Sequence, residues 1–224
     1  MGAKQSGPVS AALFPRHFGP AGLTEEAVDH FIAHTLDRAL QSLHEQIRRE
    51  LRLASGPPGK GATQVDAQAR EIARAFAANL PAVRGLLETD ILAAYQGDPA
   101  ARNIDEVLFC YPGIAAITHH RLAHELYLLG APLLAHIIAE IAHSGTGIDI
   151  HPGADIGPSF FIDHGTGVVI GETALVGRNV RLYQGVTLGA KRFASDNNGA
   201  LLKGGARHPI IEDDVVIYAG ATIL

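Results

Sequence analysis

The sequence predicts an α+β protein, in which an N-terminal α-helical domain is followed by a parallel β-solenoid of six-residue repeats. Three observations support this fold class. Apolar residues recur at three- and four-residue steps up to about residue 146, which is the repeat of one helix face. After Gly147 the period changes to aliphatic residues spaced six apart. That second period is interrupted once, between about 191 and 209.

Composition limits the classes of function. The chain has 224 residues, 47% of them hydrophobic, and a formal net charge of −5, which indicates a folded globular protein. This charge provides no basic surface for nucleic acid or an anionic membrane, and no apolar run approaches the ~18 residues of a membrane span. The first fifteen residues lack the apolar core of a signal peptide. The single cysteine, Cys110, fits a reducing compartment and is expected to be buried, so we expect a cytoplasmic protein.

The helical part is expected to contain several amphipathic helices. We predict a flexible N-terminal extension over 1–23, an α-helical assembly domain over 24–146 and a solenoid domain over 147–224, with a protruding loop at about 191–209. Thr24, followed by two glutamates, predicts a helix start, because acidic side chains favour the positive end of the helix dipole. One apolar stripe follows it: Val28, Phe31, Ile32, Leu36, Leu40, Leu43, Ile47 and Leu51.

A linker and further helices are expected next. The Gly- and Pro-rich segment 55–62 predicts the linker, and it lacks the spacing and the Lys-Ser/Thr pair of a phosphate-binding loop. Asp98 and Pro99 fit an N-cap and first-turn pair, and two more helices are expected at about 113–129 and 132–143. A shorter apolar stripe reaches Tyr95. The second stripe, which precedes it, consists of Val65, Ala69, Ile72, Phe76 and Leu80.

The six-residue period predicts the solenoid. Each hexad supplies one short strand and one turn, and three hexads make one triangular coil whose leading side chains point inward and stack on those eighteen positions later. Ordinary parallel crossovers need about a dozen residues between strands, which hexads do not have. The segment 192–209 is expected to form a loop outside the coils. The leading residues are Ile150, Ile156, Ile162, Val168, Ala174, Val180 and Val186, then Ile211, Ile217 and Ile223.

The motifs inside this pattern resemble the serine O-acetyltransferases of the hexapeptide-repeat acyltransferase family. They are DIHPGADIG (149–157), DHGTGVVIGETA (163–174), GVTLG (185–189), RHP (207–209) and, upstream, GDPAA (97–101). The resemblance covers 97–224. It implies a left-handed parallel β-helix and transfer of acetyl from acetyl-CoA to the L-serine hydroxyl, giving O-acetylserine for cysteine biosynthesis. It implies no metal.

A general base is needed for this chemistry, because an alcohol at neutral pH is a poor nucleophile. Histidine, with an ordinary pKa of about 6.5, suits the task when a carboxylate orients it. His164 follows Asp149 by fifteen residues, nearly one coil, which predicts that the two side chains lie close together. The resemblance assigns His164 as the base and Asp149 as its orienting partner. A capping role for Asp149 and a structural role for His164 are the alternatives.

An amino-acid acceptor requires a site for one ammonium and one carboxylate. The resemblance assigns Asp98 and Asp163 to the ammonium, with Glu172 nearby. It assigns Arg207 and His208 to the carboxylate, which the planar fork of an arginine fits. Asp98 as an N-cap only, and Glu172 as a structural corner residue, stay open as alternatives.

Acetyl-CoA is expected in a groove between solenoids. In related acyltransferases three solenoids pack around a threefold axis, so we expect a homo-oligomer, either a trimer or a dimer of trimers, in which loop residues meet His164 across a subunit boundary. Relatives continue into further coils and a tail that docks O-acetylserine sulfhydrylase. This chain stops at Leu224, as a truncation or a naturally short form, and the docking depends on such a tail. The expected CoA-binding residues are Gly185, Thr187, Gly189, Ala190 and Lys191, with Ala190 in place of the family's usual glycine.

Other functions stay open. One is an acetyltransferase of the same fold with another acceptor, although the charged set above argues against a sugar. Another is a non-catalytic trimeric scaffold. A zinc hydratase would need three converging histidines, and His151, His164 and His208 are its candidates without a clear tetrahedral spacing. A helical histidine cluster has an i,i+4 pair but no acidic third ligand at a suitable spacing: His119, His120 and His124.

Overall fold

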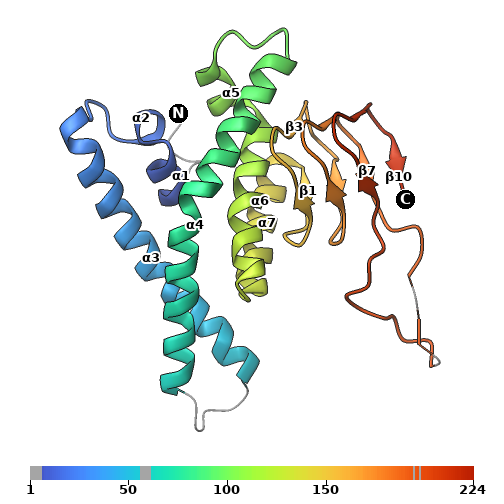
Figure 1. Cartoon of the computed structure of the whole chain (residues 1–224), viewed down its shortest axis with the longest axis horizontal. Helices are drawn as coiled ribbons and strands as arrows, with labels where there is room; N and C mark the ends of the chain where they lie inside the picture. Colours follow the sequence, from blue (N-terminus) through green and yellow to red (C-terminus); the bar gives the residue numbers. More distant parts are fainter. Residues whose placement is uncertain (1–6, 56–61, 194, 197) are drawn as a thin grey trace.

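Helices form the first part of the chain and two-residue strands form the rest (Figure 1). The computed structural model describes residues 7–55, 62–193, 195–196 and 198–224, so the predicted linker lies, apart from its two end residues, outside the described residues. Within them, no helix has the length and apolarity needed to cross a membrane. The helices are α1 (Pro8–Leu13), α2 (Pro15–Phe18), α3 (Glu25–Ser55), α4 (Ala62–Gly97), α5 (Ile104–Cys110), α6 (Pro112–Leu128) and α7 (Pro132–Thr146).

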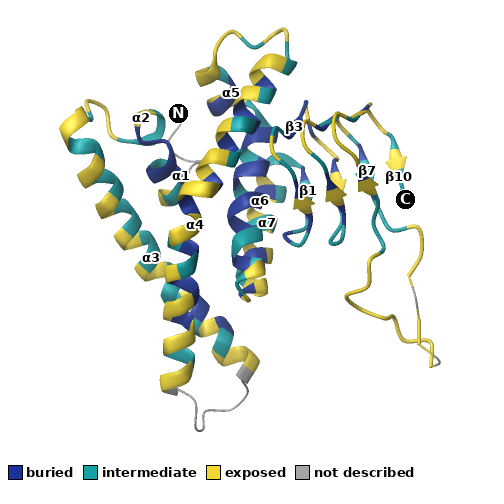
Figure 2. Cartoon of the chain, in the orientation of Figure 1, coloured by how far each residue is buried: buried dark blue, intermediate teal, exposed yellow. Residues whose placement is uncertain are grey.

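The two long helices, α3 and α4, pack against each other, and α4 in turn packs against α6 (Figure 1). Two stripes were expected between the linker and Tyr95, yet α4 is one helix that continues through Pro81. Buried residues concentrate on α4, α6 and the inner sides of the coils, whereas α3 is mostly half-buried or exposed (Figure 2). Ile47 is the one residue of the α3 apolar stripe that is fully buried.

Part of the flexible extension expected over 1–23 is helical, and its first six residues lie outside the described residues. Residues 8–18 contain α1 and α2, and α1 packs on α3. Leu13 and Phe14 are buried there, because two adjacent large apolar side chains gain more by packing than by exposure to water. Cys110 also differs from its expectation: it lies at the end of α5 and is exposed.

The strands form three parallel sheets that make the faces of a triangular solenoid. Their orders are β1-β4-β7-β10, β2-β5-β8 and β3-β6-β9. In each strand the second residue points into the coil and the first points outward. The strands are β1 (Asp149–Ile150), β2 (Asp155–Ile156), β3 (Phe161–Ile162), β4 (Val169–Ile170), β5 (Leu175–Val176), β6 (Arg181–Leu182), β7 (Thr187–Leu188), β8 (Ile210–Ile211), β9 (Val216–Ile217) and β10 (Thr222–Ile223).

The register of the first coil corrects the predicted hexads. Asp149 pairs with Val169, twenty positions later rather than eighteen. The two extra residues lie in the turn after β3, where Gly165 and Gly167 have φ of 91° and 80°, a region that glycine enters without strain. From there on, the inward strand residues are Ile170, Val176, Leu182 and Leu188. The expected leaders of these hexads are buried two positions earlier, at the corners: Val168, Ala174, Val180 and Val186.

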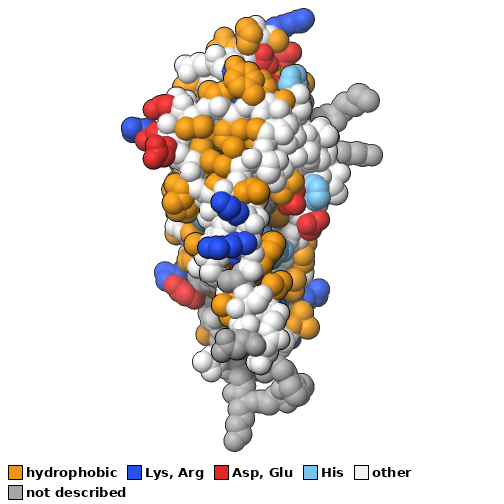
Figure 3. Space-filling model, turned by 90° about the vertical axis from the view of Figure 1, so that its right-hand side faces the viewer, with side chains coloured by type: hydrophobic (Ala, Val, Ile, Leu, Met, Phe, Trp, Pro, Cys, Tyr) orange, Lys and Arg blue, Asp and Glu red, His pale blue; other side chains and the backbone are white. Residues whose placement is uncertain are grey.

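The segment between β7 and β8 extends away from the coils (Figure 1). Leu175 therefore pairs with Ile210, thirty-five positions later. Ser195 and Leu201 form an isolated antiparallel bridge within the segment. The side of the molecule that carries the last coil displays a cluster of hydrophobic side chains (Figure 3), and Tyr218 is 71% exposed.

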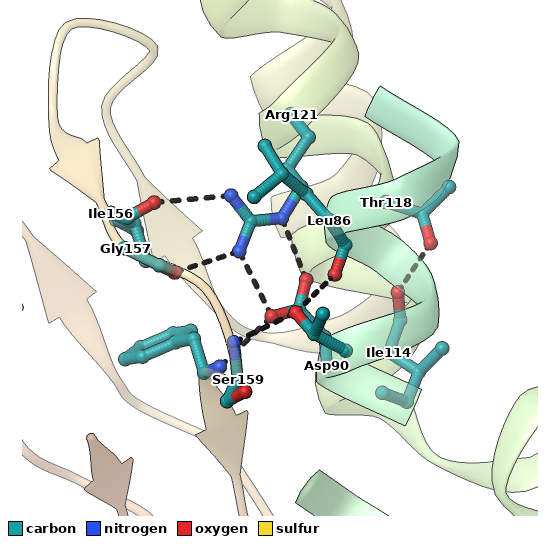
Figure 4. Close-up of polar contacts among 10 residues, drawn as sticks. Leu86, Asp90, Ile114, Thr118, Arg121, Ile156, Gly157 and Ser159 are labelled. Carbon is teal, nitrogen blue, oxygen red and sulfur yellow. Dashed lines mark hydrogen bonds and ion pairs between the residues drawn. The ribbon is translucent and has the colours of Figure 1, made fainter. Parts of the chain in front are cut away.

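A buried ion pair joins the helices to the first coil (Figure 4). Arg121 on α6 donates from Nε to Asp90 Oδ2 at 2.6 Å and from Nη2 to Oδ1 at 2.9 Å. The same guanidinium donates to the carbonyl oxygens of Ile156 and Gly157, and Asp90 accepts the Phe160 N–H at 2.8 Å. Burial raises the pKa of Asp90, and Arg121 opposes that rise. The helices and coils thus share one continuous core; whether 24–146 and 147–224 are separate domains stays a prediction.

Candidate active site

The turn after β3 carries His164. Its backbone is left-handed, with φ of 60°, and its side chain is 73% exposed. Its Nε2 lies 3.9 Å from Asp163 Oδ1. A Cβ at the next residue, Gly165, would lie 2.5 Å from Ile148 Cδ1, so glycine lets this turn lie close against the first coil. The turn therefore exposes the His164 imidazole to solvent while its own backbone packs closely against the first coil.

Asp163 is held from both sides. Its backbone N–H donates to the Leu182 carbonyl at 2.8 Å, and its carboxylate Oδ2 accepts from Arg181 Nη2 at 2.6 Å. The residue is buried. An aspartate buried to this extent needs a cationic partner, and Arg181 supplies it.

Asp98 follows the end of α4 and is not the N-cap of a helix. Its Oδ1 accepts the Ala100 N–H at 2.8 Å, and its Oδ2 accepts the Tyr111 hydroxyl at 2.5 Å. The next helix begins at Ile104 and is capped by Asn103 instead. The Tyr111 hydrogen bond, followed by that from Ala100, lowers the pKa of Asp98. The N-cap expectation is therefore wrong, and the carboxylate is held ionised in a turn.

These three residues lie at one corner of the solenoid. The charge of His164 contributes to the lowered pKa of Asp98. Burial raises the pKa of Tyr111, and so do its hydrogen bond to Asp98 and the nearby charge of Asp163. Asp98 reaches the corner from α4, and the other two residues reach it from the turn after β3.

Asp149 lies on β1, beside β4. Among the described residues, no hydrogen bond or ion pair joins its carboxylate to His164, so its role as the orienting partner stays a prediction. Its side chain points outward because Ile150 points into the coil. Val169 and Thr187 follow it in register across the sheet.

A second group of polar side chains lies at the corner after β4. Arg207 Nη2 donates to Glu172 Oε2, and the Tyr127 hydroxyl donates to Glu172 Oε1 at 3.1 Å. The hydrogen bond from Arg207 lowers the pKa of Glu172. The backbone N–H groups of Arg207 and His208 both donate to Thr173 Oγ1, at 3.0 and 3.2 Å.

His208 has a defined tautomer. Its Nδ1 accepts the Thr173 N–H at 3.1 Å, so the proton of the neutral ring is on Nε2. Burial, then the charge of Arg207, lowers the pKa of His208, which favours that neutral form. The ring lies over Gly171, where a Cβ would be 2.0 Å from Nε2.

The group around Asp163 and the group around Glu172 lie at different corners of the solenoid. The turn that holds Asp163 precedes β4, whereas Glu172 follows it. Glu172 contacts Arg207 and Tyr127, and its expected place near the ammonium stays a prediction. The strand between the corners separates them.

The expected CoA-binding residues lie along one coil, from the corner before β7 to the start of the extended segment. Gly185 lies at the corner with φ of 68°, between Gly167 and Gly220 of the neighbouring coils. Thr187 points outward from β7, and Gly189 donates its N–H to the Ile223 carbonyl at 2.9 Å. Ala190 and Lys191 follow at the start of the extended segment.

The remaining histidines considered as metal ligands, His119, His120, His124 and His151, have backbone partners in three of the four cases. Nδ1 of His119 contacts the Ala115 carbonyl and Nδ1 of His124 contacts that of Pro152, each at 2.8 Å. His151 Nδ1 accepts the Gly153 N–H at 2.9 Å. His120 is buried, and burial holds its pKa well below the usual range. In the part of the chain that the structure describes, no three His, Cys, Asp or Glu residues form a group that could hold a metal ion.

Sequence reasoning missed three residues of these corners: Tyr111, Thr173 and Arg181. Arg181 follows Asp163 by eighteen positions, one nominal coil, which was a usable indication of proximity although Arg181 itself lies in register with Phe161, twenty positions earlier. Tyr111 and Thr173 have no comparable pattern, because hydroxyl groups at such positions are common on any surface.

Comparisons with known proteins reveal close relatives. No profile of a protein family matches the chain. A plasmid-encoded serine acetyltransferase of Synechococcus elongatus is 62% identical over 96% of this chain and 68% of its own length. The serine acetyltransferase of Mycobacterium tuberculosis is 54% identical over 65% of this chain and 58% of its own. The chain thus spans less than two thirds of that relative.

Solved structures are similar over almost the whole chain. Serine acetyltransferase 1 of Entamoeba histolytica, in complex with L-cysteine, is 37% identical with a TM-score of 0.82, covering 97% of this chain and 74% of its own. Soybean serine acetyltransferase complexed with serine is 30% identical with a TM-score of 0.58, covering 98% and 84%. The helices followed by three parallel sheets match the left-handed β-helix fold of these structures.

Proposed function

The chain belongs to the serine acetyltransferase family of acyltransferases, and we propose that it transfers the acetyl group of acetyl-CoA to the hydroxyl of L-serine. The observation that carries this proposal is the corner after β3, where exposed His164 lies beside the carboxylates of Asp163 and Asp98. A base next to two anionic groups suits an acceptor that has both a hydroxyl and an ammonium.

His164 acts as the general base. It takes the proton of the serine hydroxyl while the hydroxyl oxygen attacks the thioester carbonyl carbon. The carbon–oxygen bond forms through a tetrahedral oxyanion, the carbon–sulfur bond breaks, and the CoA thiolate leaves with the proton that His164 returns. Asp149 is the proposed orienting carboxylate. Such a base accelerates the reaction by about 10²–10⁴-fold.

The ammonium of serine is proposed to bind Asp98 and Asp163. The lowered pKa of Asp98 supports its ionised form at neutral pH. The carboxylate of serine is proposed to bind Arg207 and His208, with His208 donating from Nε2. Glu172 holds Arg207 in the free chain and keeps its guanidinium oriented.

The site is proposed to be complete only between two copies of the chain. The ammonium and carboxylate of serine are attached to the same carbon atom, so one small pocket must hold both. In a single chain the groups for these two charges lie at corners on either side of β4. We therefore propose a homo-oligomer, a trimer or a dimer of trimers, in which Arg207 and His208 of one copy meet His164 of the next.

Acetyl-CoA is proposed to lie along the coil that contains Gly185, Thr187, Gly189, Ala190 and Lys191. Thr187 supports this position because it lies in register with Asp149 on the same outward face. The proposed compartment is the cytoplasm, given the single cysteine. Docking of O-acetylserine sulfhydrylase through chain beyond Leu224 stays a prediction.

The first test measures thiol release from acetyl-CoA in the presence of L-serine. H164A should lower kcat by about 10²–10⁴-fold, while H143A, which removes a half-exposed histidine on α7, should match the parent. No serine-dependent release by the folded parent would contradict the proposed function and favour the scaffold.

The shared site has its own test. H164A and R207A should each be inactive alone but recover activity when co-expressed, because about a quarter of the interfaces in a random trimer hold both wild-type residues. Absence of recovery in a mixed oligomer would show that each site is completed within one chain.

A further inference from the structure

Arg181 is a partly buried charged side chain next to the proposed ammonium site. It is the first residue of β6, and its side chain is 24% exposed. Nη2 donates to Asp163 Oδ2 at 2.6 Å, and Nη1 donates to the Gly97 carbonyl at 2.7 Å. One guanidinium thus binds two segments that are far apart in the sequence.

Two aromatic rings fix the plane of this guanidinium. Its central carbon lies 4.9 Å from the centroid of the Phe161 ring and 4.7 Å from that of Tyr183. Such cation–π contacts strengthen when the cation is shielded from water. The planar group has little freedom to rotate between these rings, so its two donor atoms keep their directions.

The contact at Gly97 places the end of α4. Gly97 is the last residue of that helix and precedes Asp98 directly. A Cβ on Gly97 would lie 3.0 Å from Phe161 Cδ1, so glycine lets the helix end approach the sheet. Arg181 then bonds the carbonyl of this residue, and the position of Asp98 follows from that bond.

We propose that Arg181 is a positioning residue for the ammonium of the acceptor substrate, a role that rests on the proposed function. It occupies Oδ2 of Asp163, and this leaves Oδ1, the oxygen 3.9 Å from His164 Nε2, for the ammonium. It also holds the helix end that carries Asp98. The two carboxylates are thereby held as one unit.

The positive charge of Arg181 also stabilises the two carboxylates before the substrate ammonium binds. Two carboxylates that share one ammonium repel each other before it binds, and such repulsion favours protonation of one of them. A guanidinium bound to Asp163, whose charge also acts on Asp98, offsets this repulsion. In the described part of the chain, no hydrogen bond or ion pair joins Arg181 to His164 or to Thr187, so its loss should affect serine and spare acetyl-CoA.

The test compares R181Q and R181K with R178Q. Arg178 is 68% exposed and pairs with Asp213 at 3.1 Å on another corner, so R178Q removes an ion pair of the solenoid without touching the site. R181Q should raise KM for L-serine about 10- to 100-fold, the usual effect of losing a charged hydrogen bond. KM for acetyl-CoA should change less than about threefold. R181K, which keeps the charge but not the fork, should be intermediate.

A second comparison asks whether Arg181 acts through Asp163. In a D163N background the effect of R181Q on kcat/KM for serine should be clearly smaller than in the parent, because the contact with Asp163 is already lost and only the contact with Gly97 remains for R181Q to remove. Thermal melting identifies any variant that fails to fold. If R181Q does not fold, the KM values of R181K test the positioning role instead.

The outcomes separate the two proposals. An inactive, folded parent overturns the proposed function itself. An active parent whose R181Q and R181K variants keep the parental KM for serine overturns the positioning role. Equal changes in KM for both substrates, or an undiminished R181Q effect in D163N, also overturn it and indicate a general structural contribution.

Discussion

Substituting Gly171 by alanine should displace His208 and little else. A Cβ at this position would lie 2.0 Å from Nε2 and 2.1 Å from Cδ2 of His208. Carbon atoms pack at about 3.5 Å or more, so the imidazole must move by roughly 1.5 Å. The Gly171 N–H donates to the Leu188 carbonyl at 3.1 Å, and this ladder bond keeps the backbone in place.

The displaced ring loses its hydrogen bond from the Thr173 N–H. Nε2 then no longer points where the proposed serine carboxylate binds. A misplacement of about 1 Å costs up to about 100-fold in rate, so G171A should raise KM for L-serine by about 10- to 100-fold. KM for acetyl-CoA should stay within about twofold, since the proposed CoA residues lie on another coil. The melting temperature should change little because His208 lies at the surface of a corner.

Steady-state kinetics with both substrates varied provide the assay. G85A is the matched control, because a Cβ on Gly85 in α4 would meet nothing within 4 Å and alanine favours helix. The reasoning fails if folded G171A binds serine as the parent does, or if both KM values rise together.

Two further predictions concern buried and hydrogen-bonded carboxylates. D90N should destabilise the protein by about 3–5 kcal/mol, because it leaves the Arg121 charge buried without its partner. Urea unfolding at fixed protein concentration measures this, and a loss below about 1 kcal/mol, the value for a surface pair, would refute it. Y111F should raise the pKa of Asp98, whose lowered value depends first on the Tyr111 hydrogen bond. The stability that ionised Asp98 adds is present above its ordinary pKa and disappears as pH falls through the lowered one, so in Y111F it should disappear at higher pH. NMR titration of the Asp98 carboxyl carbon tests this, and an unchanged midpoint contradicts it.

Much of the architecture was predictable because it depends on local periodicity. Helix faces repeat every three to four residues and coil faces every six, so apolar spacing alone separated the two parts of the chain near Gly147. Short motifs such as the one containing His164 were enough to indicate the family. The same local reasoning missed the two-residue extension after β3, because Val168 and Ile170 are both apolar and both buried.

The partners of charged side chains were decided by the tertiary structure. Asp90 pairs with Arg121, and Asp163 pairs with Arg181. In both cases the pairing depends on how α4, α6 and the coils pack.

Asp98 was expected at the ammonium site, with an N-cap as the alternative, and the structure places it near His164 in a turn held by Tyr111. Periodicity records which side chains avoid water and therefore determines the elements. The choice of ionic partners depends on distances set by all the packed elements together, so a one-dimensional pattern does not contain it.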